Sequence, residues 1–174
     1  PARRLPDSGH RMTGVPAGTI RTATTRRLVE AFGDLDGFST DPTDGLWWVT
    51  RPLSSPAKNR RIVVVGAGET LTIEPDGIAS GHGPSFDTWT IPCVLGVTDD
   101  PTLDLEAAEQ ACEDAFNQLC DWLAANDRLG PDSPGCFGVH PISLAIHSVW
   151  ESGKPPAAWA EFELQAQAII ERNP

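Results

Sequence analysis

One segment, Asp87 to Leu129, constrains the fold most, because a strand pattern leads through a short turn into an amphipathic helix. From Asp87 to Val97 the apolar residues alternate, which predicts a strand. Its expected inner face consists of Trp89, Ile91, Cys93, Leu95 and Val97. After the acidic turn at residues 98–101, apolar residues recur every three or four positions from Ala108 to Leu123. A helix with a single apolar stripe has to pack against another element, so we expect it to lie on a sheet.

The end of the chain predicts a strand with two different faces. In the stretch Ala158 to Ile170, apolar residues alternate with polar ones: Phe162, Leu164, Ala166, Ala168 and Ile170 against Glu161, Glu163, Gln165 and Gln167. One face should therefore pack on a helix, while the other is acidic and polar. A five-residue connection, Ser152 to Pro156, separates this strand from a preceding one at Val139 to Trp150, which favours an antiparallel pair.

Taken together, these patterns predict an α+β fold, with a mainly antiparallel or mixed sheet and two helices packed mainly on one face. The first helix is expected to begin at Thr19 or Thr22 and to end at Gly33. We expect a flexible N-terminal arm at residues 1–18 and a single domain at residues 19–174. Pro92 cannot donate a ladder hydrogen bond, so its strand should be at an edge there or carry a bulge.

Charge is distributed unevenly along a chain of net charge −11. Residues 1–61 hold 10 of the 13 basic residues and 6 of the 24 acidic residues, for a net charge of +4. Residues 62–174 hold the other 3 basic and 18 acidic residues, for a net charge of −15. A chain this acidic is a poor general nucleic-acid binder, because Lys and Arg supply most of such affinity. Arg3, Arg4 and Arg11 either belong to a solvated tail or contact an acidic partner surface.

Several motifs resemble parts of a binding or catalytic site, but none of them is complete. Gly66 and Gly68 follow a β-branched run, as in a dinucleotide-binding loop, but Leu71 stands where a third glycine is needed. A glycine-rich turn is the better interpretation. His140 and His147, seven apart in a strand, should point to opposite faces. We therefore predict no catalytic, cofactor-binding or metal-binding residue.

The cysteines and the hydropathy narrow the class of protein further. Cys93, Cys112, Cys120 and Cys136 lack metal-ligand spacing, so buried free thiols are expected. No apolar run reaches the roughly 18 residues needed to span a membrane, and the start of the chain lacks the apolar core of a signal peptide. We expect a protein that is made in a cytoplasm and has no membrane partner.

Trp47 and Trp48 are adjacent in a predicted strand, Leu46 to Thr50. Their rings must then point to opposite faces of the sheet. One can enter the core, whereas the other needs either a loop over it, such as residues 52–60, or a partner subunit. Trp47 and Trp48 are thus candidate residues for a protein–protein contact.

The order of these elements resembles the tail terminator (tail completion) proteins of long-tailed bacteriophages over roughly residues 19–171. The resemblance rests on a helix around Thr24 to Ala31, the strand Asp87 to Val97, the acidic helix start Leu105 to Glu109, the strand Pro141 to Trp150 and the closing strand Ala158 to Leu164. It implies a virion structural protein without cofactor or enzymatic activity. Such a protein forms a homohexameric ring on the tail tube, stops tube polymerisation and docks to the head-completion (neck) protein.

In such a ring, DNA passes through the channel without sequence-specific binding. The candidate interface residues are Arg3, Arg4, Arg11, Trp47, Trp48, Glu161 and Glu163. Two alternatives remain open. The first is a head–tail adaptor or neck protein, which would also be a small ring-forming subunit. The second is a nucleotide-dependent enzyme domain, which would use Gly66 and Gly68.

Overall fold

The computed structural model describes residues 17–44, 46–52, 61–66, 73–74, 85–98, 100–126, 128–129 and 136–170. In this part of the chain the helices are α1 (Ala17–Gly33) and α2 (Leu105–Ala125). The strands are β1 (Phe38–Ser39), β2 (Trp47–Thr50), β3 (Arg61–Val65), β4 (Ile73–Glu74), β5 (Ser85–Val97), β6 (Cys136–Val149) and β7 (Ala157–Ile170). The predicted arm falls on residues 1–16, outside the described part, and on residues 17–18, which form the start of α1.

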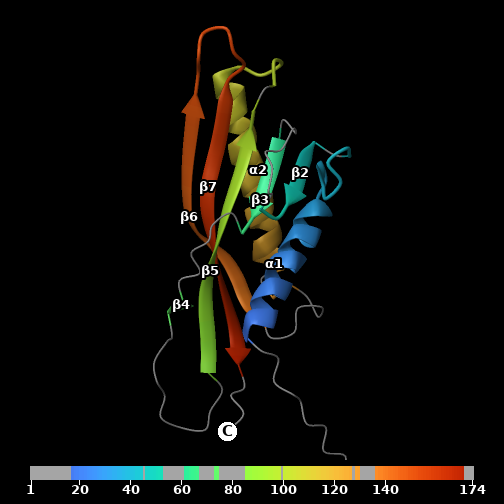
Figure 1. Ribbon diagram of the computed structural model, residues 1–174, viewed down its shortest axis with the longest axis vertical. Coiled ribbons are helices and arrows are strands. Elements are labelled where there is room, and N and C mark those ends of the chain that lie inside the picture. Colours follow the sequence, from blue (N-terminus) through green and yellow to red (C-terminus); the bar gives the residue numbers. More distant parts are fainter. Residues whose placement is uncertain are drawn as a thin grey trace, which may run out of the picture.

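The strands form one open mixed sheet in the order β1-β2-β3-β5-β7-β6, with β4 paired to β5. The two pairs β1–β2 and β2–β3 are parallel, and all the other pairs are antiparallel. The long strands β5, β6 and β7 run along the length of the molecule (Figure 1). The predicted α+β class with a mixed sheet is confirmed.

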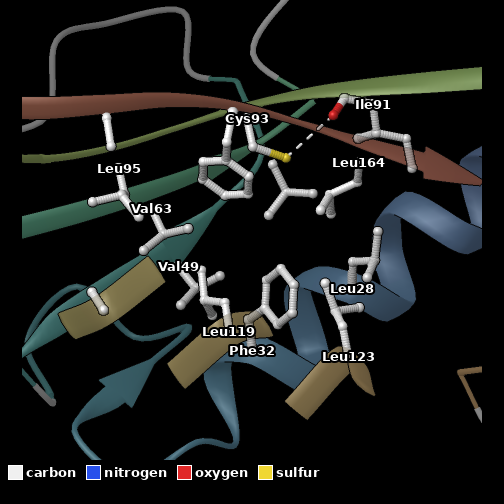
Figure 2. Close-up of a cluster of buried hydrophobic side chains, with 14 of the residues drawn as sticks. Leu28, Phe32, Val49, Val63, Ile91, Cys93, Leu95, Leu119, Leu123 and Leu164 are labelled. Carbon is white, nitrogen blue, oxygen red and sulfur yellow. Dashed lines mark hydrogen bonds between the residues drawn. The ribbon is translucent and has the colours of Figure 1, made fainter. Parts of the chain in front are cut away.

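Both helices cover the same face of this sheet. The core joins Leu28 and Phe32 of α1 to Leu119 and Leu123 of α2, and Figure 2 shows these four side chains on one side of the strands. Phe32 meets Trp122 edge to face, with the ring centroids 5.9 Å apart. The two helices therefore pack on each other as well as on the sheet, and neither helix of the described residues lies on the other sheet face, as predicted.

The start of α2 is fixed by two carboxylates. Asp104 is the N-cap, and its side chain accepts a hydrogen bond from the Ala107 N–H at 2.8 Å. In the preceding turn, Asp100 accepts hydrogen bonds from the Thr102 hydroxyl and N–H at 2.6 and 3.1 Å. Its other oxygen lies 3.4 Å from the Arg61 guanidinium at the start of β3. The helix is thus tied to the sheet at the residue where it begins.

Strands β5 and β7 show the predicted alternation. Trp89, Ile91, Cys93, Leu95 and Val97 of β5 are buried, and so are Phe162, Leu164, Ala166 and Ala168 of β7. Pro92 lies in an internal strand with a regular register to β7, so the predicted bulge is wrong. The edge prediction holds only locally, because β3 pairs with β5 as far as Cys93 and β4 begins to pair at Trp89. Between these points, β7 is the only neighbour of β5 among the described strands.

The prediction that His140 and His147 point to opposite faces is wrong. They pair with Gln165 and Trp159, which are six residues apart on β7 and so lie on one face, the face without a helix. The reason is a register shift in β6 between Pro141 and Ser143, which changes the phase of the strand. A single irregular position was enough to reverse the assignment, because side chains alternate with a period of two.

Candidate assembly surface

The sheet face without a helix carries the acidic pair that the sequence singled out. Glu161 lies between Val94 of β5 and Ala145 of β6, and Glu163 is flanked by Pro92 and Ser143 in the same way. Both glutamates are exposed. Since all four cross-strand neighbours are uncharged, neither carboxylate has an ion-pair partner within the described residues. The predicted exposed, acidic outer face of β7 is confirmed for these two positions.

A shallow hollow of about 450 Å³ lies over this acidic pair. It is lined by Pro92, Val94, Ser143, Ala145, Glu161 and Glu163, together with three residues of the strand backbone beneath. Its side chains offer carboxylates and one hydroxyl, and it contains no His, Lys or Arg. The hollow therefore presents negative charge at the surface.

The two tryptophans of β2 lie on opposite faces, as a strand requires. Trp47 is only 4% exposed, stacks on Phe38 with the ring centroids 6.1 Å apart, and has the Arg61 guanidinium 6.0 Å from its ring centre. The neighbours within the subunit thus enclose Trp47, which offers no free surface. Trp48 is half-buried, and its indole N–H donates to the Thr40 carbonyl at 3.1 Å. Of the pair, Trp48 is the better contact candidate. Arg3, Arg4 and Arg11, the remaining candidates, lie outside the described residues.

An apolar edge that sequence reasoning missed lies along β6. Five large apolar side chains are exposed there or just beyond the strand: Ile142 by 45%, Leu144 by 41%, Ile146 by 40%, Val149 by 46% and Trp150 by 66%. Leu144 and Ile146 pair with Phe162 and Ala160, so they lie on the helix side of the sheet. The absence of any Asp, Glu, Lys or Arg from Cys136 to Val149 was the available signal.

The cysteines are placed mainly as the sequence suggests. Cys93 and Cys112 are buried free thiols, and Cys120 is a half-buried one. Burial raises the pKa of Cys93 to about 12 and that of Cys112 to about 11. Both thiols stay protonated near neutral pH and act as small apolar side chains. The side chain of Cys136 lies outside the described residues.

The glycine motif ends a strand. Gly66, directly after β3, has a φ of +83°, a conformation that glycine adopts without strain. Residues 67–72 lie outside the described part, and residues 73–74 form β4. A dinucleotide-binding loop would lead into a helix at this point.

No group of three or more His, Cys, Asp or Glu in the described part of the chain is arranged to hold a metal ion. Neither α1 nor α2 is long and apolar enough to cross a membrane.

No protein-family model matches the chain, and no curated protein matches it either.

Proposed function

We propose that this protein is a virion structural protein of the tail terminator type. Six copies form a ring on the end of a phage tail tube, stop its polymerisation and join the tail to the head-completion (neck) protein. The ring belongs to the tail or neck of the virion and is assembled in the host cytoplasm. No cofactor or enzymatic step is part of the proposal.

One observation carries the proposal: both helices of the described residues, α1 and α2, lie on the same face of the sheet formed by the long strands β5, β7 and β6. On the opposite face, the middle of β7 carries the exposed Glu161 and Glu163, where a second packed layer would need apolar side chains. A subunit of a ring can use such a face as a surface of the assembly. The helix-covered face meanwhile holds the subunit together without help from its neighbours.

The acidic face suits a channel wall. If it faces the axis, six copies bring twelve carboxylates from Glu161 and Glu163 alone around the path of the DNA. Like charge keeps the duplex from adhering to the wall during passage. The net charge of −15 over residues 62–174 acts in the same direction.

Light scattering of the purified chain, alone and mixed with tail tubes of the same virus, tests the ring. We expect a hexameric mass, or a smaller species that becomes a ring and caps tube ends seen by electron microscopy. A species that binds the neck protein but ignores tube ends would favour the head–tail adaptor alternative. A species that ignores both would overturn the proposal.

A charge-reversed variant tests the arm. Replacing Arg3, Arg4 and Arg11 with Glu removes the positive charge that would meet an acidic neighbour. We expect normal rings and weaker joining of tails to heads in a reconstitution assay. The control reverses Arg26, which is exposed on α1 and lies outside the arm. Unchanged joining by the arm variant would contradict this part of the proposal.

A further inference from the structure

We propose that the β6 edge pairs two copies of the free protein. The two β6 strands would run antiparallel across a two-fold axis near Ile146 and join the two sheets into one. This contact goes beyond the proposed ring and does not depend on it.

The edge is open along half of its length. β6 is the last strand in the sheet order, and among the described strands it pairs only with β7. Its first half carries Pro141 and two register shifts, at Cys136/Gly138 and Pro141/Ser143. Prolines and bulges of this kind protect an edge from pairing. From Ser143 to Val149 the register is regular, so this stretch has no such protection.

The unprotected stretch also lacks charge. Natural edge strands usually carry Lys or another charged residue that discourages pairing. Between Cys136 and Val149 there is none, in a chain whose net charge is −11. Two copies of an acidic protein repel each other through most of their surface. An uncharged edge is therefore where a second copy approaches with the least repulsion.

The apolar side chains on this edge are only partly covered by α2. Leu144 pairs with Phe162, whose ring meets Phe116 of α2 at 5.2 Å, and Phe162 itself is buried. Ser148, further along β6, hydrogen-bonds to Glu109 of α2. Leu144 and Ile146 lie between these two contacts, yet remain 41% and 40% exposed. A second β6 would bring another Leu144 and Ile146 beside them, in the space between two α2 helices.

We expect the partner of the β6 edge to be a second copy of the chain, because its own β6 has the same length and pattern of side chains. At the other border of the sheet, β1 has only two residues, too few to pair along Ser143–Val149. An antiparallel β6 pair is self-complementary: Ile146 faces the second copy's Ile146, and Leu144 faces the second copy's Ser148. A two-fold contact of this type is the commonest in homo-oligomers.

The size of the edge sets the strength of the contact. The seven residues of the regular stretch, Ser143–Val149, span about 24 Å, and a sheet with its side chains is about 10 Å thick. The strip therefore offers about 240 Å² per copy, well below the roughly 800 Å² of a standard interface. We expect a reversible dimer whose population rises with concentration. A cyclic ring with two different faces cannot contain this two-fold contact, so dimer and ring are alternative states.

Sedimentation velocity over a concentration series, without tail tubes, tests the proposal. Wild type should shift from monomer to dimer with increasing concentration. Ile146→Lys places two ammonium groups across the axis and should raise the dimer Kd by about tenfold or more. The control Leu46→Lys replaces an apolar side chain away from β6 that is even more exposed, 56% against 40% for Ile146, and should dimerise like wild type. Circular dichroism of each variant checks that the fold is intact.

Cross-linking gives a second measurement that does not depend on weakening the contact. Directly opposed residues in an antiparallel pair have Cα atoms about 4.5–5.5 Å apart, within the range that a disulfide bridges. Ile146→Cys should therefore form a covalent dimer under mild oxidation, at a rate that Leu46→Cys and wild type do not reach. A monomeric wild type, dimerisation of Ile146→Lys equal to wild type, or no excess cross-linking of Ile146→Cys would each overturn the proposal. A free protein that is already a hexamer would support the ring and overturn the dimer, because the two are alternative states.

Discussion

The two faces of β7 share one backbone and differ in what they contact. On the helix side, Phe162 and Leu164 are buried under α2 and α1. On the other side, Glu161 and Glu163 are exposed and have uncharged neighbours. The comparison separates two roles within the strand. The inner face holds the subunit together, whereas the outer face contributes little to folding and is free for contacts outside the subunit.

The largest expected effect tests the inner face. Phe162→Ala removes a ring that is 2% exposed and contacts Phe116, so we expect a loss of about 3–5 kcal/mol in the free energy of unfolding. Urea denaturation measures it. The matched control on the outer face, Glu163→Ala, should change the free energy by less than about 0.5 kcal/mol. Equal losses in both variants would remove the distinction between the faces.

How well the sequence predicts which side chains lie on each face depends on the regularity of the strand. The alternation in Ala158 to Ala168 identified both faces correctly, because β7 pairs with β5 without a register shift. The same reasoning failed for His140 and His147 because of the shift at Pro141/Ser143. Pro141 was visible in the sequence, but a proline shows neither whether a bulge forms nor how far it changes the phase.

The assembly surface was harder to predict, for a physical reason. The alternation in β6 would suggest that Leu144 and Ile146 are buried, since they share a face with Phe162 and Ala160. Their exposure depends on how far α2 reaches across the sheet, which the apolar stripe of α2 does not specify. The two-residue strand β1 is likewise too short to leave a periodic pattern. Trp47 and Trp48 were assigned correctly to opposite faces, although which of them enters the core followed only from the packing of Phe38.

A smaller effect tests how firmly α2 is held on the inner face. Asp104→Ala removes the N-cap hydrogen bond to the Ala107 N–H, and we expect a loss of about 1 kcal/mol in the free energy of unfolding. Thermal unfolding followed by circular dichroism measures it. Asp104→Ser keeps an oxygen at the cap and should recover most of the loss. A Ser variant as unstable as the Ala variant would show that the cap is not the cause.

Acid should weaken the contact that ties α2 to β3. The Thr102 hydroxyl and N–H, together with Arg61, hold the pKa of Asp100 below its ordinary value. A carboxyl whose pKa is lowered by folding contributes stability above its unfolded pKa, about 4. That stability is lost as the pH falls through the folded pKa. Denaturation curves between pH 6 and about pH 3 should show a smaller decline for Asp100→Asn than for wild type. An identical decline would mean that Asp100 contributes nothing to the acid sensitivity.

The smallest expected effect returns to the outer face of β7. Glu161 and Glu163 lie two positions apart on one face of β7, so their charges repel each other over about 7 Å along the strand. The double variant Glu161→Gln, Glu163→Gln removes this repulsion, and we expect a gain below about 0.5 kcal/mol in the free energy of unfolding. Thermal unfolding at low and high salt measures it, and the gain should shrink as salt screens the wild-type charges. A clear loss of stability would mean that the two carboxylates have partners within the subunit. In that case, the outer face of β7 would contribute to folding after all.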